Sequence, residues 1–171
     1  MGEKVGANLI MKEGAIDIAT NPKTYYGYGE EFKGLFVTES GERFLDESIF
    51  HFTRTRVMLD KGINDFWAIT SEYNDRVGES IADGFGFEAN TIEELQELIK
   101  ADKLIETVDR YNELSQSGSD TDFGKNAEFM KPIEGEKVYA LKMFLSNSGT
   151  FGGLDTDIDS RVVKEDGTVI K

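Results

Sequence analysis

The chain has 171 residues, with 19 lysines and arginines against 33 aspartates and glutamates, and a formal net charge of −14. This length allows one domain with a sizeable core, or one domain with fragments of another, and 39% hydrophobic residues suffice for a globular fold. The strong negative charge argues against nucleic acid and anionic membranes as partners. We expect a cytoplasmic protein, because the sequence contains no long apolar run, no signal-peptide pattern and no cysteine.

The first 32 residues give only weak structural signals. Residues 2–8 suggest the end of a helix, and residues 9–18 suit extended structure or an edge strand. Residues 20–32 are rich in Asn, Pro, Gly and Tyr without periodicity, which is typical of a loop. The tyrosines of this loop either pack on the surface or face a substrate as part of a lid. They are Tyr25, Tyr26 and Tyr28.

The next stretch predicts a tight turn that leads into a helix. Residues 35–37 and 43–44 flank Glu39-Ser40-Gly41, a pattern that indicates a strand, a turn and a return strand. Asp46 is predicted to cap a helix that runs to about residue 60. Glu47 would then occupy the first helical position, where a negative charge suits the helix dipole.

The predicted helix has two distinct faces. The face that we expect to pack on the core carries Ile49, Phe52, Thr53 and Val57. The other face carries His51, Arg54, Thr55 and Met58. The second face therefore presents the only histidine of the chain beside a guanidinium group.

The middle of the chain predicts one strand and two helices. Residues 66–70 form a short apolar run that suits a buried strand, whereas residues 71–90 indicate irregular structure. Thr91 and Glu94 form a capping box, which predicts a helix with Ile92, Leu95 and Ile99 facing inward. A second helix over residues 101–116 carries an apolar stripe. The stripe consists of Leu104, Ile105, Val108, Tyr111 and Leu114.

The last third of the chain predicts a strand and a hairpin. Residues 138–145 alternate in polarity, so that one face of a strand would carry Tyr139, Leu141, Met143 and Leu145. Asp166-Gly167 separates two short apolar runs and favours a hairpin turn. Gly152-Gly153 permits close approach of the backbone to a planar ligand or another segment, although a simple bulge or turn gives the same pattern.

Several kinds of functional site are excluded by the residues themselves. One histidine and no cysteine rule out the usual zinc sites and cysteine nucleophiles. The sequence has no Gly-x-Ser-x-Gly elbow, no phosphate-binding loop and no Gly-x-Gly-x-x-Gly that opens a helix after a strand. The polar loop over residues 115–126 lacks the glycine and the terminal glutamate of a calcium loop, so we expect no metal site.

Three segments carry motifs that belong together. They are Gly41-Glu42-Arg43-Phe44 with Asp46-Glu47, then Thr107-Val108-Asp109-Arg110-Tyr111-Asn112 with Asp120, Asp122, Phe123 and Gly124, and finally Thr150 with Gly152-Gly153-Leu154. In order and spacing they resemble motifs of the FAD-dependent fumarate reductase and succinate dehydrogenase-type flavoproteins. This group includes soluble flavocytochrome fumarate reductases, urocanate reductase and ketosteroid dehydrogenases.

The resemblance implies an α+β fold, that of the capping (substrate-lid) domain of such a flavoprotein, with a mixed small sheet and helices. Residues 1–8 would be the tail of the FAD-binding domain, residues 9–148 the capping domain, and residues 149–171 the start of the return into the FAD-binding domain. The main FAD site would lie outside this chain. The chain would then be an excised fragment that is inactive alone.

The resemblance also implies an activity and its residues. The full-length enzyme would reduce or form a carbon–carbon double bond in a small substrate by hydride transfer with flavin. His51 occupies about the position of the proton-donating arginine of the fumarate reductases, and Arg54 is the alternative donor. The substrate-binding residues would be Arg43, Glu47, Gly149 and Thr150, and the residues beside the flavin would be Thr150, Gly152 and Gly153. Gly149 replaces a histidine of the fumarate reductases, which points away from fumarate.

A hypothesis of another class remains open from the composition. A stand-alone acidic α+β module could bind a protein or a glycan through the tyrosine loop. It would fold as a monomer and lose binding on truncation of Tyr26 or Tyr28.

Overall fold

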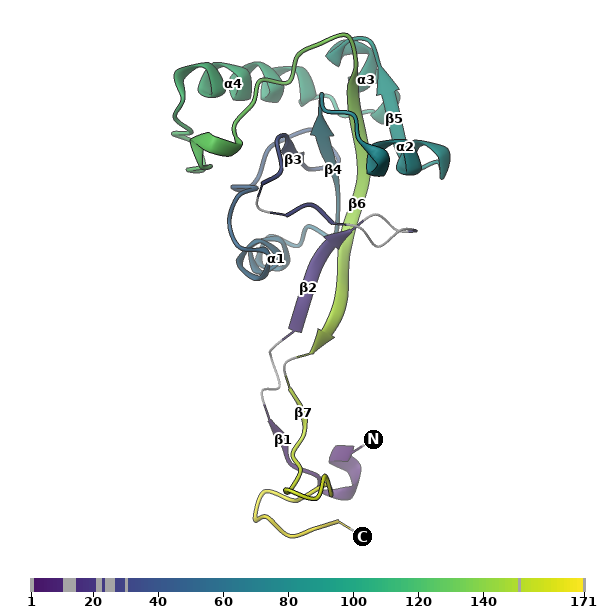
Figure 1. Ribbon diagram of the computed structural model, residues 1–171, viewed down its shortest axis with the longest axis vertical. Coiled ribbons are helices and arrows are strands. Elements are labelled where there is room, and N and C mark those ends of the chain that lie inside the picture. The colour runs from purple at the N-terminus through teal and green to yellow at the C-terminus, as the bar shows by residue number, and fades with distance from the viewer. Residues whose placement is uncertain are drawn as a thin grey trace. The chain divides into compact units, whose positions relative to one another are not determined.

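A computed structural model describes residues 2–10, 15–20, 23, 27–29, 31–150 and 152–170, without the side chains of residues 15–20 and 147–150. The chain divides into two compact units (Figure 1). The larger unit comprises residues 18–146, and the smaller unit combines residues 1–17 with residues 147–171. Helices and small antiparallel sheets occur together, which confirms the α+β class. No helix in the described part of the chain has the length and apolar character needed to cross a membrane.

An antiparallel sheet is the centre of the larger unit. Its strands are β2 (Ala15–Thr20), β3 (Leu35–Val37), β4 (Asp65–Thr70), β5 (Gly86–Ala89) and β6 (Val138–Thr150). The strand order is β2-β6-β4-β3, and β5 also pairs with β6. The same residues of β6 pair with β4 and with β5, so these two strands lie on opposite edges of β6. The predicted strands at 35–37, 66–70 and 138–145 are confirmed.

Helices cover both faces of this sheet. They are α1 (His51–Asp60), α2 (Asp75–Ala82), α3 (Ile92–Ile99) and α4 (Leu104–Ser117), with a 3-10 turn at Ala127–Phe129. One core contains Leu35, Val37, Trp67, Ile69, Val138 and Ala140 with residues of α3 and α4. The other contains Phe36, Phe66, Ala68, Tyr139, Leu141 and Met143 with Met58 of α1 and Val77 of α2. Since successive strand residues point to opposite faces, the sheet lies between the two helix pairs.

The helices α3 and α4 follow the sequence prediction closely. The Thr91 hydroxyl accepts a hydrogen bond from the Glu94 amide at 3.2 Å, as the capping box predicts. The Glu94 carboxylate, however, accepts from the amide of Asn90 at 2.9 Å, one residue earlier than expected. The stripe on α4 is buried at Leu104, Val108, Tyr111 and Leu114. It therefore belongs to the core.

The start and the buried face of α1 differ from the prediction. The helix begins at His51, and the Asp46 carboxylate instead accepts hydrogen bonds from the amide and hydroxyl of Ser48 in a local turn. The prediction of Asp46 as the helix cap and Glu47 as the first helical residue is therefore wrong. The buried face carries Arg54, Thr55 and Met58, the set predicted to face away from the core. A guanidinium can occupy that face because its two Nη groups donate to backbone carbonyl oxygens inside the unit.

Residues 71–90 are more regular than the sequence indicates. Asn74 caps α2 by accepting from the Val77 amide at 3.1 Å, and β5 follows at Gly86. Both elements are short, with eight and four residues, so their periodicity was too brief to recognise.

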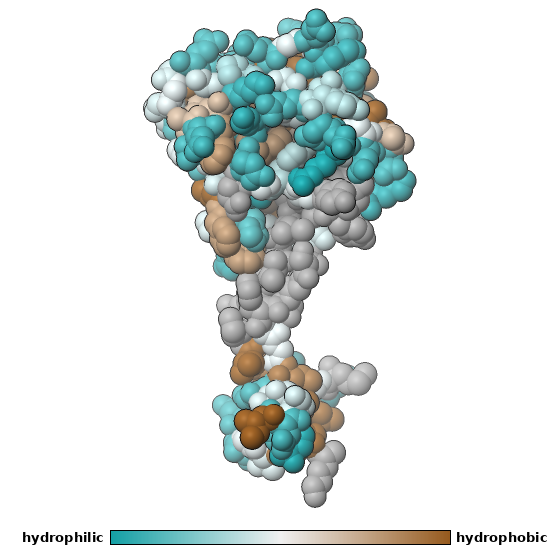
Figure 2. Space-filling model, viewed as in Figure 1, coloured by the Kyte–Doolittle hydropathy of each residue, from teal (hydrophilic) through white to brown (hydrophobic). Residues whose placement is uncertain are grey.

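The smaller unit contains a two-stranded sheet and a hairpin. β1 (Leu9–Ile10) pairs antiparallel with β7 (Gly153–Leu154), and residues Gly2–Val5 form a 3-10 helix. Val163 pairs with Val169 across the turn at Gly167, whose φ is +80°, so the predicted hairpin is confirmed. Figure 2 shows both hydrophilic and apolar side chains on the face of this unit that is in view.

Candidate functional site

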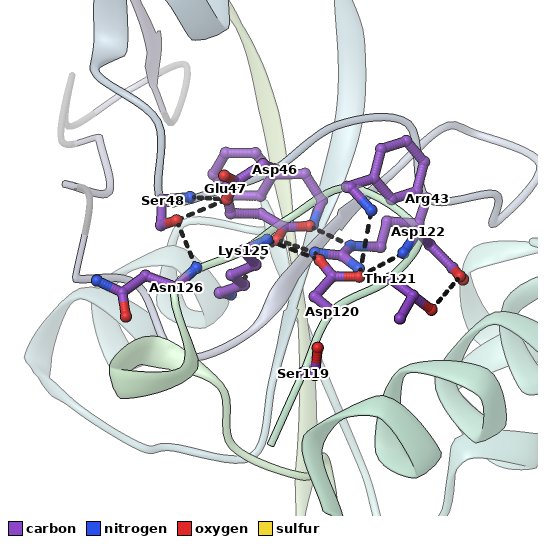
Figure 3. A network of polar contacts seen from close by, with 12 residues as sticks. Arg43, Asp46, Glu47, Ser48, Ser119, Asp120, Thr121, Asp122, Lys125 and Asn126 are labelled. Carbon is purple, nitrogen blue, oxygen red and sulfur yellow. Dashed lines mark hydrogen bonds and ion pairs between the residues drawn. The ribbon is translucent and has the colours of Figure 1, made fainter. Parts of the chain in front are cut away.

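Four charged side chains are packed inside the larger unit, next to the start of α1 (Figure 3). This buried charge cluster consists of Arg43, Glu47, Asp120 and Lys125. Arg43 forms a two-pronged contact with Glu47 at 2.9 and 2.8 Å and reaches Asp120 at 2.8 Å. The side chains of Arg43 and Glu47 are only 6% and 0% exposed. Two cations thus face two carboxylates, which balances the charge of the cluster.

Asp120 organises the loop that brings α4 back to the sheet. Its carboxylate accepts hydrogen bonds from the amides of Asp122, Phe123 and Lys125 at 3.1, 3.2 and 3.0 Å. Burial opposes ionisation of Asp120, but the hydrogen bonds from Arg43 and the Lys125 amide outweigh it and lower its pKa. The ionised carboxylate therefore holds both its own loop and the loop of Arg43.

Lys125, in the loop that follows α4, completes the cluster. Its ammonium group is fully buried, donates to the carbonyl oxygen of Gly34 and lies 3.4 Å from the Glu47 carboxylate. Burial lowers the pKa of Lys125, while the charge of Glu47 acts in the opposite direction. Glu47 also accepts from the amide of Phe36 in β3 at 3.0 Å. The cluster consequently fastens the residues before α1 to the edge strand.

Arg54 extends these contacts into α1. It is 2% exposed, and its guanidinium donates to the carbonyl oxygens of Glu47 at 2.9 Å, Tyr28 at 2.6 Å and Gly29 at 3.4 Å. The side-chain carboxylate of Glu47 is thus bound within the charge cluster, while its backbone carbonyl oxygen accepts a hydrogen bond from Arg54 of α1. Arg54 fixes α1 to the loop around Tyr28 as well.

His51 lies at the first position of α1 among aromatic rings. Its ring centroid is 4.4 Å from that of Phe50 and 4.2 Å from that of Phe52. His51 is partly exposed, whereas Arg54 on the same helix is buried. Of the two predicted donors, His51 is therefore the one with a side chain open to a small molecule.

Of the four predicted substrate residues, Arg43 and Glu47 lie in the buried charge cluster. Arg43 and Glu47 bind one another and buried neighbours, while Nη1 of Arg43 has no hydrogen-bond partner among the described residues. Gly149 and Thr150 end β6, and the side chain of Thr150 lies outside the described part of the structure. Gly152 and Gly153 belong to the smaller unit, and a Cβ added at Gly153 would meet no described atom within 4 Å. The backbone at Gly153 is thus open to approach.

The tyrosine loop is only partly described, because Tyr25 and Tyr26 lie outside the described residues. The ring of Tyr28 packs against that of Phe32 at 4.1 Å, and burial raises the pKa of its hydroxyl. Tyr28 therefore contributes to packing near the Arg54 contact.

Sequence reasoning missed Asp120 and Lys125, which it assigned to a polar loop. The available signal was the Asp120-Thr121-Asp122-Phe123-Gly124 run, which is part of the motif that carries the family resemblance. A second missed feature is a cavity of about 260 Å³ beside the cluster. It is lined by Glu42, Arg43, Lys103, Glu106, Thr107, Arg110, Tyr111, Leu114, Asp122 and Phe123. In the described part of the chain, acidic and histidine side chains form no group of three suited to a metal ion.

Comparisons with known proteins agree on one family. The family described as FAD binding domain matches residues 8–171. NADH:acrylate oxidoreductase of Vibrio harveyi is 31% identical over 193 residues, which cover 100% of this chain and 18% of that protein. Vinyl phenol reductase of Lactiplantibacillus plantarum is 26% identical over 167 residues, covering 80% of this chain and 34% of that protein.

A solved structure shows the same fold. The open conformation of a flavocytochrome c3 fumarate reductase superimposes with a TM-score of 0.79 at 20% sequence identity, covering 99% of this chain and 32% of that chain. The chain therefore spans between 18% and 34% of the length of these three proteins.

Proposed function

Because the chain belongs to the FAD-binding domain family, we propose that it is the capping domain, with short adjoining stretches, of a flavoprotein oxidoreductase acting on a carbon–carbon double bond. The observation that carries this proposal is the match over residues 8–171, together with relatives named as an NADH:acrylate oxidoreductase and a vinyl phenol reductase. We place the capping domain at residues 9–148, between an FAD-domain tail at 1–8 and the return segment at 149–171. The division into two compact units supports an arrangement of this kind, with contact boundaries at 18 and 146.

FAD fits this chain only in part. The open backbone at Gly153 suits the approach of a planar ring, and we propose that Thr150, Gly152 and Gly153 lie beside it. The sequence has no loop that would bind a diphosphate, so the rest of the cofactor belongs to another part of the protein. When bound there, the flavin would supply or accept the hydride.

His51 is the residue that we assign to the proton step. In the reduction, one carbon of the double bond gains a hydride and the other gains a proton, so the π bond is replaced by two C–H bonds. The His51 imidazole is a common general acid, and its partial exposure allows the donated proton to be replaced from solvent. We also assign Gly149 and Thr150 to substrate contact.

Arg54, Arg43 and Glu47 have a positioning role in this proposal. Arg54 holds α1 through the Glu47 carbonyl, and Glu47 is held by Arg43. The imidazole is thereby presented from a helix whose first turn is anchored at several points. Misplacement of a proton donor by about 1 Å can cost a large factor in rate.

The test uses the full-length flavin-loaded protein. The flavin is reduced without oxygen, unsaturated acids and enones are added, and the return of the oxidised absorption band is followed. We expect His51→Ala to slow this return by about 10²–10⁴-fold, since that is the usual contribution of a general acid. Thr53→Ala, on the exposed face of the same helix, is the control and should react at the wild-type rate.

Two results would contradict the proposal at different points. Failure of every alkene to reoxidise the flavin would refute the activity. Full turnover of His51→Ala would refute only its assignment as the donor. The isolated 171-residue chain, incubated with FAD and freed of unbound dye, should retain no flavin band; retention would place the cofactor site inside this chain.

A further inference from the structure

The cavity of about 260 Å³ beside the buried charge cluster has no role in the proposed reaction. Its lining residues belong to α4, to Lys103 just before that helix, and to the loops that carry Arg43 and Asp122. All of them lie in the larger unit, and neither His51 nor any other residue of α1 is among them. The cavity is therefore separate from the place assigned to the proton step.

Arg43 supplies an unused hydrogen-bond donor at this cavity. Its side chain is 6% exposed, and its Nε and Nη2 groups contact Glu47 and Asp120. Its Nη1 group is buried and has no hydrogen-bond partner in the part of the chain that the structure describes. A buried charged donor without an acceptor is costly, and such a group is commonly met by a water molecule or a ligand. An oxygen atom bound in the cavity would satisfy this donor.

The side chains around Arg43 suit a flat apolar body. The centroids of the Tyr111 and Phe123 rings lie 5.1 and 5.0 Å from the guanidinium carbon, and Leu114 adds an aliphatic side chain to the lining. Tyr111 is fully buried, whereas Phe123 is 39% exposed. Because exposed side chains change rotamer rapidly, movement of the Phe123 ring can give a ligand oxygen access to Nη1. A bound aromatic ring can then pack against Phe123.

The charges around the cavity disfavour an anionic ligand. Lys103 already faces Glu106 at 3.8 Å, and Arg110 faces Asp122 at 2.8 Å. Glu42 adds a third carboxylate to the lining. The charge of Arg43 is itself balanced within the charge cluster, so a ligand carboxylate would meet a net negative rim. A cationic ligand would suit that rim but would leave Nη1 without an acceptor.

We propose that this cavity binds a small neutral molecule with a carbonyl oxygen on a flat apolar ring. The oxygen accepts from Nη1 of Arg43, and the ring packs against Phe123. An aromatic primary amide fits best, because its NH2 group can also donate to a carboxylate at the rim. The inference goes beyond the proposed function, since it needs neither the flavin nor the double bond.

The test is isothermal titration calorimetry on the full-length flavin-loaded protein with benzamide, benzoate and benzylamine. These probes have nearly the same shape and differ in the charge and in the acceptor of the polar group. We expect benzamide to bind about 10-fold more tightly than either of the others, the usual effect of one hydrogen bond to a charged group. Benzoate meets the carboxylates of the rim, and benzylamine offers no oxygen to Nη1.

A cavity-filling variant locates the binding. Thr107 lines the cavity on α4 and is partly exposed, so Thr107→Phe should raise the Kd of benzamide by about 10-fold or more. Gln116→Phe is the matched control, because it adds the same ring at an exposed position of α4 outside the cavity lining. Its Kd for benzamide should equal that of the wild type.

Three results would overturn the inference. They are equal binding of benzoate or benzylamine by the wild type, an unchanged Kd in Thr107→Phe, and no binding of any probe, which would leave Nη1 to water alone. The comparison of probes on the wild type decides the matter even if Thr107→Phe does not fold. None of these results bears on reoxidation of the flavin by alkenes, so the proposed function stands or fails by its own test.

Discussion

Asp120 and Asp122 offer a matched test of what burial does to an ion pair. Each carboxylate contacts an arginine at 2.8 Å, Arg43 for Asp120 and Arg110 for Asp122. The side chains of Asp120 and Arg43 are 0% and 6% exposed, whereas those of Asp122 and Arg110 are 34% and 50% exposed. Replacing either aspartate by asparagine removes one charge from the same loop at nearly constant volume.

Asp120→Asn should lower the free energy of unfolding by about 3–5 kcal/mol, the usual cost of leaving a buried charge without its partner. The new amide group would also place a donor against either Arg43 or the loop amides. Asp122→Asn should cost less than about 1 kcal/mol, because the exposed pair is screened by water. Denaturant unfolding can be followed by fluorescence of Trp67, the only tryptophan, which is 9% exposed in the core of the larger unit.

The pH dependence of stability provides a second test of the Asp120–Arg43 pair. The pKa of Asp120 is lowered in the folded state, so its contribution to stability is present above the ordinary carboxyl pKa of about 4 and is lost as the pH falls through the lowered value. The difference between wild type and Asp120→Asn should therefore narrow in acid. Equal losses for the two variants at neutral pH would refute the reasoning that burial makes the Asp120 contact important.

Three further predictions concern local structure, each measured by thermal or denaturant unfolding. Met58→Ala should lower the free energy of unfolding by about 2–5 kcal/mol because Met58 is fully buried. Thr53→Ala, on the exposed face of the same helix, should change it by less than about 0.5 kcal/mol. Equal effects of the two variants would mean that α1 packs on its other face. Gly41→Ala should cost more than about 1 kcal/mol, because φ is +93° and a Cβ would lie 2.6 Å from the Leu104 amide; a neutral result would place that turn elsewhere. Thr91→Ala should cost about 1 kcal/mol and Thr91→Ser much less, unless the cap contributes nothing.

The sheet was the most predictable part of the fold. Strands β4 and β6 have buried residues on both faces of the sheet. In β6, alternation along the strand assigns Tyr139, Leu141 and Met143 to one core and Ala140 to the other. This pattern depends on the pleat alone, so no knowledge of the partner strand is needed. The same is true of α3, whose cap and buried face are encoded within nine residues starting at Thr91.

The beginning of α1 shows why the local signals failed. Asp46 followed by Glu47 is a favourable start for a helix in isolation. In the fold, Glu47 gains contacts with Arg43, Lys125 and the Phe36 amide, which a position in the first helical turn would not give. Because of these tertiary contacts, the helix begins at His51 rather than at Glu47.

The candidate site was visible in sequence only as separate motifs. The segment with Arg43 and Glu47 and the segment with Asp120 lie far apart along the chain, and no periodicity links them. Arg54 was predicted to be accessible because charged residues usually are. Its burial depends on carbonyl oxygens of Tyr28 and Gly29, which carry no sequence signature.

The first and last strands of the larger unit, β2 and β6, are hydrogen-bonded neighbours in the sheet. A segment that leaves and rejoins its surroundings through adjacent strands spans almost no distance between its two ends. Such a segment can be lengthened, shortened or exchanged without changing the gap that the surrounding protein must bridge. The two ends of the larger unit, helices included, therefore have the geometry of an insertion that one pair of neighbouring strands connects to the rest of the chain.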